Sequence, residues 1–279
     1  MSASLKNDTP SLAWKGGRLS PFTRCVLADN PSALTYAGTN TWILSRTDSS
    51  KAILVDPGPE SKKHFEAIAR VCKEDGLNIE AILLTHSHLD HSEGAAELAK
   101  YLAVSVFSRK DATLKDGLFQ LNDESVVVEV ISLPGHCADS IGICFGLDRS
   151  IVTGDVIFAQ SPTIIALPDG NLRDYFESLR YLKELVKEGF YTSLLSGHGV
   201  PIEDPLSCIS KTEAHRFKRL AQLRGAINRG NTIDIDYLLE IIYIDIDACL
   251  KKAAKTNLQA QLEYLFAIQD PCVSGFREP

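Results

Sequence analysis

Thr85-His86-Ser87-His88-Leu89-Asp90-His91 is the stretch that decides how this 279-residue chain is interpreted. It places three of the seven histidines and one aspartate within six positions. The apolar run AILLT leads into it and a helical pattern follows, which predicts a loop between a strand and a helix. A helix cap would need only one polar residue, such as Ser87 or Asp90. Imidazoles and a carboxylate this close together instead suit Zn²⁺ and neighbouring transition metals, so the stretch predicts a metal site.

Three further residues of the metal-binding kind stand alone downstream, each directly after a glycine. His136 follows ISLPG, Asp155 follows SIVTG and His198 follows SLLSG. Each alone would more often be a turn residue. Together they mark strand ends, and the ends of neighbouring strands meet at one edge of a sheet, where sites in layered α/β folds gather. We therefore expect all three side chains to lie near the histidine-rich loop.

The middle of the chain alternates between strand and helix patterns. Helical periodicity predicts helices at 61–72, 91–101 and 172–187. Short buried strands between helices indicate a layered α/β fold in which helices cover sheets. The apolar runs that predict strands are 41–44, 52–55, 79–84, 104–107, 126–133, 141–145, 151–153 and 193–195.

The pattern predicts three segments along the chain. Residues 1–20 are polar and are expected to be flexible, and 21–204 form the core. From 205 to 279 strand patterns stop and only helical stretches follow, which predicts a helical C-terminal appendage. Those stretches are 205–229, 232–242, 246–254 and 256–268, with Thr232 and Asn257 as candidate caps.

Composition narrows the class of protein. Hydrophobic residues make up 44% and charged residues 23%, which is ordinary for a globular protein. No apolar run reaches the roughly 18 residues of a membrane helix, and the N-terminus lacks a signal-peptide pattern. The seven cysteines are scattered without a C-x-x-C pair, which favours reduced thiols in the cytoplasm. A net charge of −7 disfavours an extended nucleic-acid surface.

The succession THSHLDH, PGH, TGD and SGHG resembles the metallo-β-lactamase superfamily over about residues 22–200. The resemblance implies a four-layer αββα sandwich, with two sheets inside and helices on the outer faces. It also implies that Asp56, in ILVDPG, braces the site without binding a metal. The implied ligands are His86, His88 and His136 for a first metal, and Asp90, His91 and His198 for a second, with Asp155 bridging both.

The resemblance implies a hydrolase with two divalent metal ions, most simply Zn²⁺, with Mn²⁺ and Fe²⁺ as alternatives. A hydroxide bridging the metals would attack an ester, thioester, amide or phosphodiester, and Asp90 would orient it as the catalytic carboxylate. The ligand set disfavours other branches. Flavodiiron proteins usually have Glu at the position of His88, and true β-lactamases lack Asp at the position of Asp155. A mononuclear iron persulfide dioxygenase remains an alternative.

A narrower resemblance rests on Asn30-Pro31-Ser32 with Gly38-Thr39-Asn40-Thr41-Trp42, and on the helix segment 174–179. These features resemble the lactamase-β-like endoribonuclease branch, also described as hydroxyacylglutathione-hydrolase-like. The resemblance implies that the C-terminal segment is a small winged-helix-like domain. It also implies four candidate substrate-binding residues: Asn40, Thr41, His215 and Arg216.

The substrate class stays open between several alternatives. We favour a small-molecule ester or thioester, because the chain is acidic and lacks an extended basic groove. Single-stranded RNA is the second alternative, since residues 211–229 are locally basic and could guide a phosphate backbone, although a solvated helix face explains them as well. A third alternative is a tail that binds nucleic acid or a protein partner. The sequence predicts no membrane partner and leaves the oligomeric state open.

Overall fold

A computed structural model describes residues 13–121, 125–244 and 246–277 of the chain. Residues 1–12 of the N-terminal stretch predicted to be flexible therefore lie outside the described residues. The rest of that stretch differs from the prediction. Strand β1 (Gly16–Arg18) pairs antiparallel with β2 (Thr23–Leu27), so ordered structure begins before residue 20.

The strands form two sheets, one of six strands in the order β1-β2-β3-β4-β5-β6 and one of five in the order β11-β10-β9-β8-β7. The first sheet continues with β3 (Asn40–Ser45), β4 (Lys51–Val55), β5 (Asn78–Leu83) and β6 (Ser105–Phe107). The second sheet contains β7 (Gly117–Gln120), β8 (Val127–Ser132), β9 (Ile141–Phe145), β10 (Ser150–Gly154) and β11 (Ser193–Ser196).

Strand β3 shows how the sandwich is built, because all six of its residues are buried. Alternate side chains of a strand point to opposite faces. Trp42 and Leu44 pack in a core with Val130 and Ile143 of the other sheet. Ile43, between them, packs in a separate core that lies under the helices on the outer face. Both faces of the strand are therefore covered.

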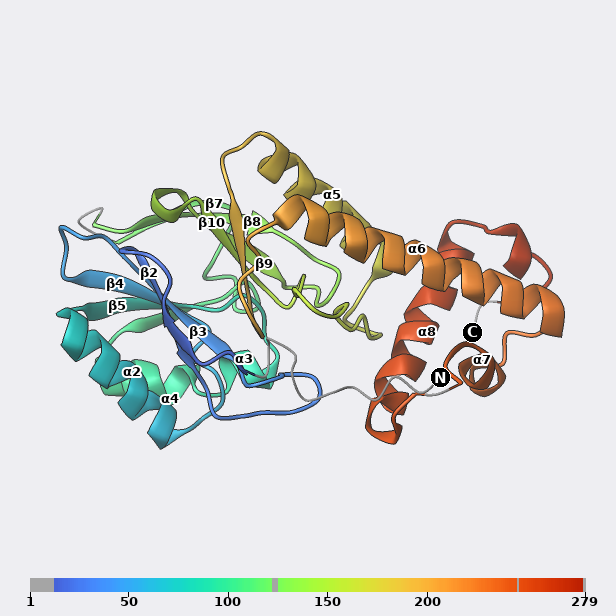
Figure 1. Cartoon of the computed structure of the whole chain (residues 1–279), viewed down its shortest axis with the longest axis horizontal. Helices are drawn as coiled ribbons and strands as arrows, with labels where there is room; N and C mark the ends of the chain where they lie inside the picture. Colours follow the sequence, from blue (N-terminus) through green and yellow to red (C-terminus); the bar gives the residue numbers. More distant parts are fainter. Residues whose placement is uncertain (1–12, 122–124, 245, 278–279) are drawn as a thin grey trace.

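Helices cover the outer face of each sheet, as Figure 1 shows. On the first sheet lie α2 (Lys62–Asp75) and α4 (Ala95–Leu102), and on the second lies α5 (Leu172–Lys187). The predicted four-layer αββα arrangement is confirmed. The predicted helix 91–101 is divided into α4 and a short α3 (Leu89–Ser92), with Gly94 capping α4.

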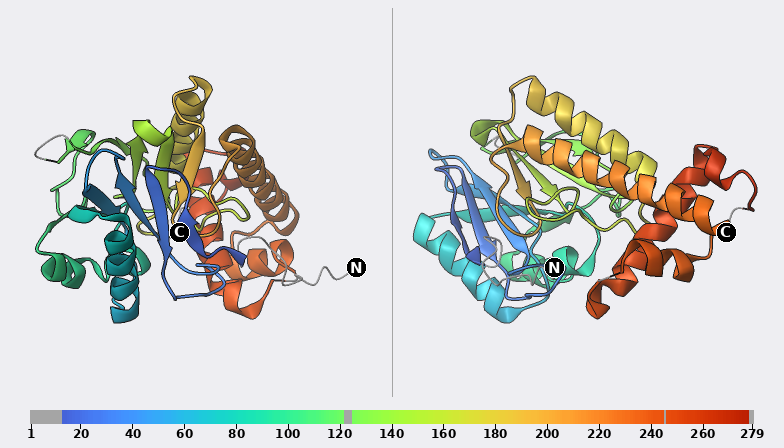
Figure 2. Two further views of the ribbon diagram at one scale, coloured as in Figure 1. Left: turned by 60° about the vertical axis from the view of Figure 1, so that its left-hand side comes forward. Right: turned by 45° about the vertical axis from the view of Figure 1, so that its right-hand side comes forward.

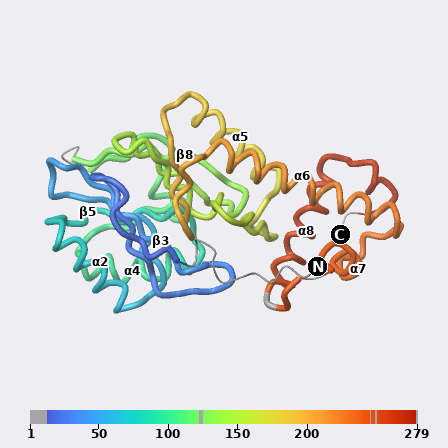
Figure 3. Tube along the Cα trace, in the orientation of Figure 1, coloured from blue at the N-terminus to red at the C-terminus, as the bar shows by residue number. Residues whose placement is uncertain are grey.

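The chain leaves the core along α6 (Pro205–Gly230), which starts where the helical tail is predicted to begin. Figure 2 shows α6 beside α5, and Figure 3 follows the chain along α6 to the remaining helices. These are α7 (Ile235–Ile242), the 3-10 turn η2 (Ala248–Leu250) and α8 (Lys251–Ala267). The predicted helical tail is confirmed, and its described part contains no strand. Its likeness to a winged helix stays a prediction.

Two predicted caps in the tail are wrong. Asp234, not Thr232, caps α7 by accepting a hydrogen bond from Tyr237 N. Asn257 lies inside α8, because the two predicted helices 246–254 and 256–268 are largely one helix. The carboxamide of Asn257 faces the core instead, where it accepts a hydrogen bond from Ile165 N at 3.0 Å.

Tail and core share one apolar interior. Leu223 of α6 and Leu262 of α8 are fully buried in the same cluster as Leu179 of α5 and Ile151 of β10. The domain boundary predicted at residue 205 therefore coincides with a change of secondary structure and not with a break in packing. None of the described helices is long and apolar enough to cross a bilayer.

Candidate metal centre

The predicted ligands meet at one edge of the sandwich, on loops that follow strands of both sheets. The first sheet supplies the histidine-rich loop after β5, and the second supplies the residues after β8, β10 and β11. Their ligand atoms fall into two groups, each gathered within 4.8 Å. The first group contains His86, His88 and His136, and the second contains Asp90, His91, Asp155 and His198.

In the first group, three ring nitrogens converge. Nδ1 of His88 lies 3.1 Å from Nε2 of His86 and 3.0 Å from Nε2 of His136. Two ligands bound to one tetrahedral Zn²⁺ at 2.0–2.1 Å lie about 3.3 Å apart. The spacing of the three nitrogens therefore suits a single cation.

In the second group, Nε2 of His198 lies 3.3 Å from Nε2 of His91 and 3.2 Å from Oδ2 of Asp90. Asp155 reaches both groups. Its Oδ1 lies 3.2 Å from Nε2 of His91, and its Oδ2 lies 3.4 Å from Nε2 of His198 and 3.9 Å from Nε2 of His136. The carboxylate of Asp155 thus lies between the two groups of ligand atoms.

The tautomers of three histidines test whether a cation fits. Nδ1 of His91 lies 2.9 Å from Oδ2 of Asp56, that of His136 lies 2.7 Å from the carbonyl of Ile164, and that of His198 lies 3.2 Å from the carbonyl of Gly38. A neutral imidazole has one N–H, so donation from Nδ1 leaves a lone pair on Nε2. These lone pairs point at one another and at carboxylates, which favours a bound cation.

Two electrostatic observations agree with this fit. Oδ1 of Asp155 is buried and makes no well-aligned hydrogen bond, although Nε2 of His91 lies 3.2 Å away. Burial would lower the pKa of His91, yet the carboxylates of Asp155 and Asp56 raise it well above its usual value. Burial likewise opposes a charge on His198, but Asp155 and Asp90 raise its pKa to about 9. The buried carboxylates thus create a potential that attracts positive charge to this point.

Asp56 lies where a bracing residue is expected. Its fully buried carboxylate accepts hydrogen bonds from the backbone N–H of Thr85 at 2.8 Å and from its hydroxyl at 2.7 Å. The same carboxylate holds Nδ1 of His91. Asp56 therefore fixes both the start of the ligand loop and the orientation of one ligand, from behind the centre.

The glycines before the ligands allow close approach of neighbouring groups. A β-carbon on Gly197 would lie 2.3 Å from Oδ1 of Asp155 and 2.6 Å from Cε1 of His91. A β-carbon on Gly135, whose φ is 132°, would lie 2.4 Å from Cα of Tyr175. Both positions exclude any larger residue next to the ligands.

Two of the four candidate substrate-binding residues lie elsewhere than expected. Asn40 and Thr41 are fully buried and do not line the cavity. The amide of Asn40 donates to the carbonyls of Ser196 and Gly199, which flank the His198 loop. The hydroxyl of Thr41 donates to the carbonyl of Asp56 at 2.7 Å. Both residues lie at the start of the buried strand β3. They hold the backbone next to His198 and at Asp56 and do not contact the cavity.

A cavity of about 720 Å³ opens over the centre and extends to the tail. His215 and Arg216 of α6, the other two candidate substrate-binding residues, line it. So do apolar side chains from the core and from the tail, including Leu34, Tyr36, Phe158, Ile164, Tyr243, Ile246 and Leu250. Among the ligands, His88, Asp90, His136, Asp155 and His198 line its floor.

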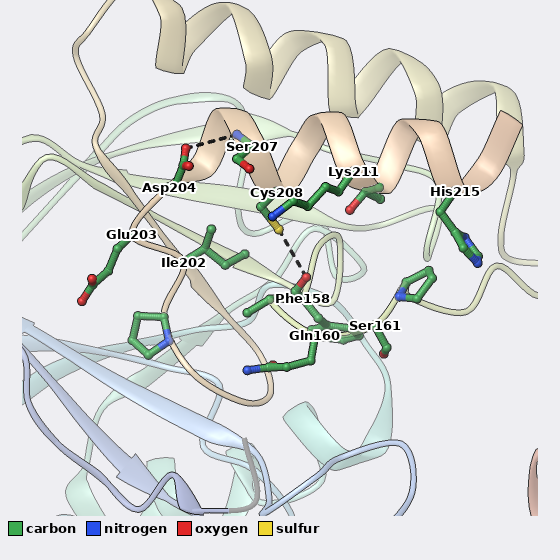
Figure 4. A pocket seen from close by; sticks show the side chains of 14 residues that line it. Phe158, Gln160, Ser161, Ile202, Glu203, Asp204, Ser207, Cys208, Lys211 and His215 are labelled. Atoms are coloured by element: carbon green, nitrogen blue, oxygen red, sulfur yellow. Dashed lines mark hydrogen bonds between the residues drawn. The ribbon is translucent and has the colours of Figure 1, made fainter. Parts of the chain in front are cut away.

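A smaller chamber of about 400 Å³ adjoins the cavity, and Figure 4 shows it from close by. Its α6 wall carries Ser207, Cys208, Lys211 and His215, and loops near Phe158 and Glu203 face that wall. The two cavities share the residues Phe158, Gln160, Ser161, Pro162 and His215. The hollow space next to the centre is therefore elongated along α6.

Sequence reasoning missed the residues that hold the ligands through backbone atoms or across long distances. One example is Ile164, whose carbonyl holds His136; Asp169, whose Oδ2 lies 3.9 Å from Nε2 of His88, is near the ligands without a hydrogen bond to them. A backbone carbonyl leaves no mark in a sequence. Asp169 follows a proline in an irregular segment, where an aspartate is most simply a turn residue.

Comparisons with known proteins agree with this geometry. The family model described as metallo-beta-lactamase superfamily matches residues 34–116. The "Beta-lactamase-like protein 2 homolog" of Caenorhabditis elegans is 27% identical over 261 residues, which cover 89% of this chain and 85% of that protein. An "Atrochrysone carboxyl ACP thioesterase" of Aspergillus chevalieri is 28% identical over 221 residues, covering 76% of this chain and 68% of that protein.

A solved structure extends the likeness in fold to nearly the whole chain. A metallo-beta-lactamase family protein from Thermus thermophilus superposes with a TM-score of 0.73 at 19% identity, covering 90% of this chain and 95% of the other. The family model, the sequence relatives and the shared fold agree with the motifs found in the sequence. Residues 34–116 match the metallo-beta-lactamase superfamily, and the chain has the fold of that superfamily, whose members are metal-dependent hydrolases.

Proposed function

We propose that the enzyme hydrolyses a small-molecule thioester or ester at a centre of two divalent metal ions. The observation that carries this proposal is the placement of two ligand groups, joined by Asp155, at the floor of a cavity with largely apolar walls. We assign one ion to His86, His88 and His136 and the other to Asp90, His91 and His198. Zn²⁺ suits this donor set, and Mn²⁺ and Fe²⁺ are the alternatives.

With ions held by these residues, the site would supply a water of lowered pKa and an electrophile that polarises the scissile carbonyl. Asp90 borders the cavity. Burial would raise the pKa of its carboxyl group, but His198 and His91 hold it below its usual value. The carboxylate is therefore ionised and can orient the attacking water and accept its proton.

The cavity walls support a substrate with an apolar acyl group. Leu34 and Phe158 from the core face Tyr243 and Leu250 from the tail across the space. Burial of an apolar chain there would contribute roughly 25 cal/mol for each Å² removed from water. The match to a protein named as a thioesterase supports the same substrate class. His215 and Arg216 line the wall on the tail side and would contact the part of the substrate farther from the reacting carbonyl.

The acidic net charge of the chain and the largely apolar lining of the cavity also favour a small molecule over a polymer. Cleavage of single-stranded RNA is the alternative that the basic stretch on α6 keeps open, and docking of nucleic acid or a partner on the tail is another. Both make use of Lys and Arg near residues 211–229. A persulfide dioxygenase would need a single iron ion that takes part in oxidation. The proposed hydrolase needs two ions that keep their oxidation state.

One experiment separates these functions. The purified chain is analysed for metal and assayed with a medium-chain acyl thioester and with a fluorogenic single-stranded RNA. We expect about two metal ions per chain, thioester hydrolysis, and loss of both in Asp155→Ala but not in the matched surface variant Asp116→Ala. If the protein cleaves the RNA and not the thioester, the substrate is RNA and the proposed substrate class is wrong. One iron per chain with oxygen consumption would replace the hydrolase with the dioxygenase.

A further inference from the structure

The segment 163–165 lies between the metal centre and the helical tail. On one side it holds His136, whose Nδ1 donates to the carbonyl of Ile164 at 2.7 Å and lies 3.1 Å from the hydroxyl of Thr163. Thr163 and Ile165, on either side of Ile164, are 2% and 1% exposed, so the segment is anchored in the interior. The position of this segment therefore decides where Nε2 of His136 points.

On its other side the tail holds the same segment. The guanidinium of Arg216, on α6, donates to the carbonyl of Thr163 and, through Nη1, to Oδ1 of Asn257 at 3.3 Å. The same oxygen of Asn257, on α8, accepts from Ile165 N at 3.0 Å. Arg216 is only 4% exposed, and its guanidinium also lies over the ring of Tyr175 on α5. Two tail helices thus hold Thr163 and Ile165, the residues on either side of Ile164.

The other group of ligands has no comparable dependence on the tail. His91 is oriented by Asp56, at the end of β4, and His198 by the carbonyl of Gly38, before β3. Both supports belong to the first sheet. A displacement of α6 or α8 would therefore reach His136 through hydrogen bonds, whereas, among the described residues, α6 approaches His198 only through the ring of Phe158, whose carbonyl accepts from Cys208 Sγ.

We propose that Arg216 and Asn257 are positioning residues, through which the helical tail sets the metal affinity of the group His86, His88 and His136. The proposal rests on the proposed function in one respect, namely that this group binds a metal. Groups that hold the second ring nitrogen of a metal-bound histidine typically change metal affinity about 10- to 100-fold when they are removed. Here the support acts one step farther away, through the Thr163, Ile164 and Ile165 backbone.

The chain offers a matched set of variants at Asn257. Asn257→Ala removes the oxygen that accepts from Ile165 and Arg216. Asn257→Asp keeps an oxygen in that place and adds a charge complementary to Arg216. It should therefore keep the hydrogen bonds from Ile165 N and Arg216. Arg224→Ala serves as the control, because it breaks the ion pair with Asp270 at 2.7 Å within the tail and touches none of residues 163–165.

The full-length variants are titrated with Zn²⁺ in competition with a chromophoric chelator. We expect two binding steps in the wild type. In Asn257→Ala one step should weaken about 10-fold or more while the other is unchanged, and Asn257→Asp and Arg224→Ala should match the wild type. Proton NMR of the Co²⁺-loaded protein gives a second readout, since faster exchange of a single shifted ring N–H is expected in Asn257→Ala.

Each contrary result has a distinct meaning. A wild type that binds no metal overturns the proposed function itself. Two unchanged steps in Asn257→Ala, with a normal wild type, overturn only the positioning role. Weaker binding in both Asn257→Ala and Arg224→Ala, in proportion to their loss of thermal stability, would show that general loosening of the tail is the cause and would also overturn the role.

Discussion

Gly197 lies against Asp155 so closely that a β-carbon at this glycine would come within 2.3 Å of the Oδ1 of the aspartate. Gly197 Cα and the carboxylate thus occupy adjoining space with no room for a methyl group. The aspartate is the residue that faces both ligand groups, so the whole centre depends on the absence of a side chain at position 197.

Gly197→Ala should therefore disrupt the centre. Since the neighbours are a carboxylate and the ring of His91 and not a flexible chain end, the ligands must move, and we expect metal affinity to fall about 10-fold or more. Metal analysis after dialysis against a weak chelator measures the loss. Gly146→Ala is the control, because a β-carbon there meets nothing within 4 Å. Equal metal content in the two variants would contradict this interpretation of the glycine.

Asp56→Asn should weaken binding at the group of His91 while leaving the volume of the side chain unchanged. The amide can still accept from Thr85 N, but its NH₂ group would face Nδ1 of His91 and force the proton to Nε2. We expect an approximately 10- to 100-fold loss of metal affinity, about that of other supports of metal-bound histidines. A chelator-competition titration measures it. Retention of wild-type affinity would show that the carboxylate is not what sets this tautomer.

His64 should make the protein less stable in mild acid. It is buried, Nε2 lies 2.8 Å from the hydroxyl of Thr41, and burial lowers its pKa to about 4. The unfolded chain binds a proton at its ordinary pKa of about 6.5, so stability is full above that value and falls as pH drops from about 6.5 towards 4. The full loss is about 3 kcal/mol.

Urea unfolding of the metal-free wild type and of His64→Gln between about pH 4 and 7 tests this prediction. The free energy of unfolding of His64→Gln should vary less with pH across that window, by up to about 1.4 kcal/mol per unit. Chelator in both samples removes the pH dependence of metal binding. Parallel curves for the two proteins would mean that His64 is not buried in its neutral form.

Leu223→Ala should destabilise the whole chain and not the tail alone. Leu223 is fully buried in a cluster that joins α6 to α5 and to β10. Leucine-to-alanine changes in such cores cost about 2–5 kcal/mol. We expect a single unfolding transition at lower urea by both circular dichroism and tryptophan fluorescence, while Leu206→Ala, at a partly exposed position, changes little. Two separate transitions would show that the tail unfolds by itself.

Much of the fold could be predicted because its signals are local. Buried strands such as β9 and amphipathic helices such as α5 lie at the residues that periodicity indicates. β1 and β7 are short edge strands with exposed residues, so their pairing with a neighbour and not their own pattern defines them. The preference of asparagine for caps misplaces Asn257, because in the structure its contact with Ile165 decides its role.

In the candidate site too, features with a local sequence signal could be predicted and features that depend on packing could not. His86 to His91 form one loop, and glycine marks the three distant ligands, so the sequence alone could predict which residues gather. The supports could not be predicted in the same way. Ile164 acts through its carbonyl, and Arg216 reaches Thr163 from a separate helix. Such contacts depend on how the elements pack in three dimensions and leave no periodic or compositional mark.

The loop after β5 belongs to one sheet and the residues after β8, β10 and β11 belong to the other. Ions held between them would therefore fasten the two leaves of the sandwich together along their open edge. The same seven side chains would then both hold the two sheets together and bind the catalytic ions. Substitution of any of them would impair both stability and activity. Most of the cavity walls, contributed by surface loops and by the tail, have no such second role, the exceptions being Ile164, Arg216 and Asn257, which also help to position His136. A lineage of this enzyme could acquire new substrates by changing the walls while the fastening stays constant.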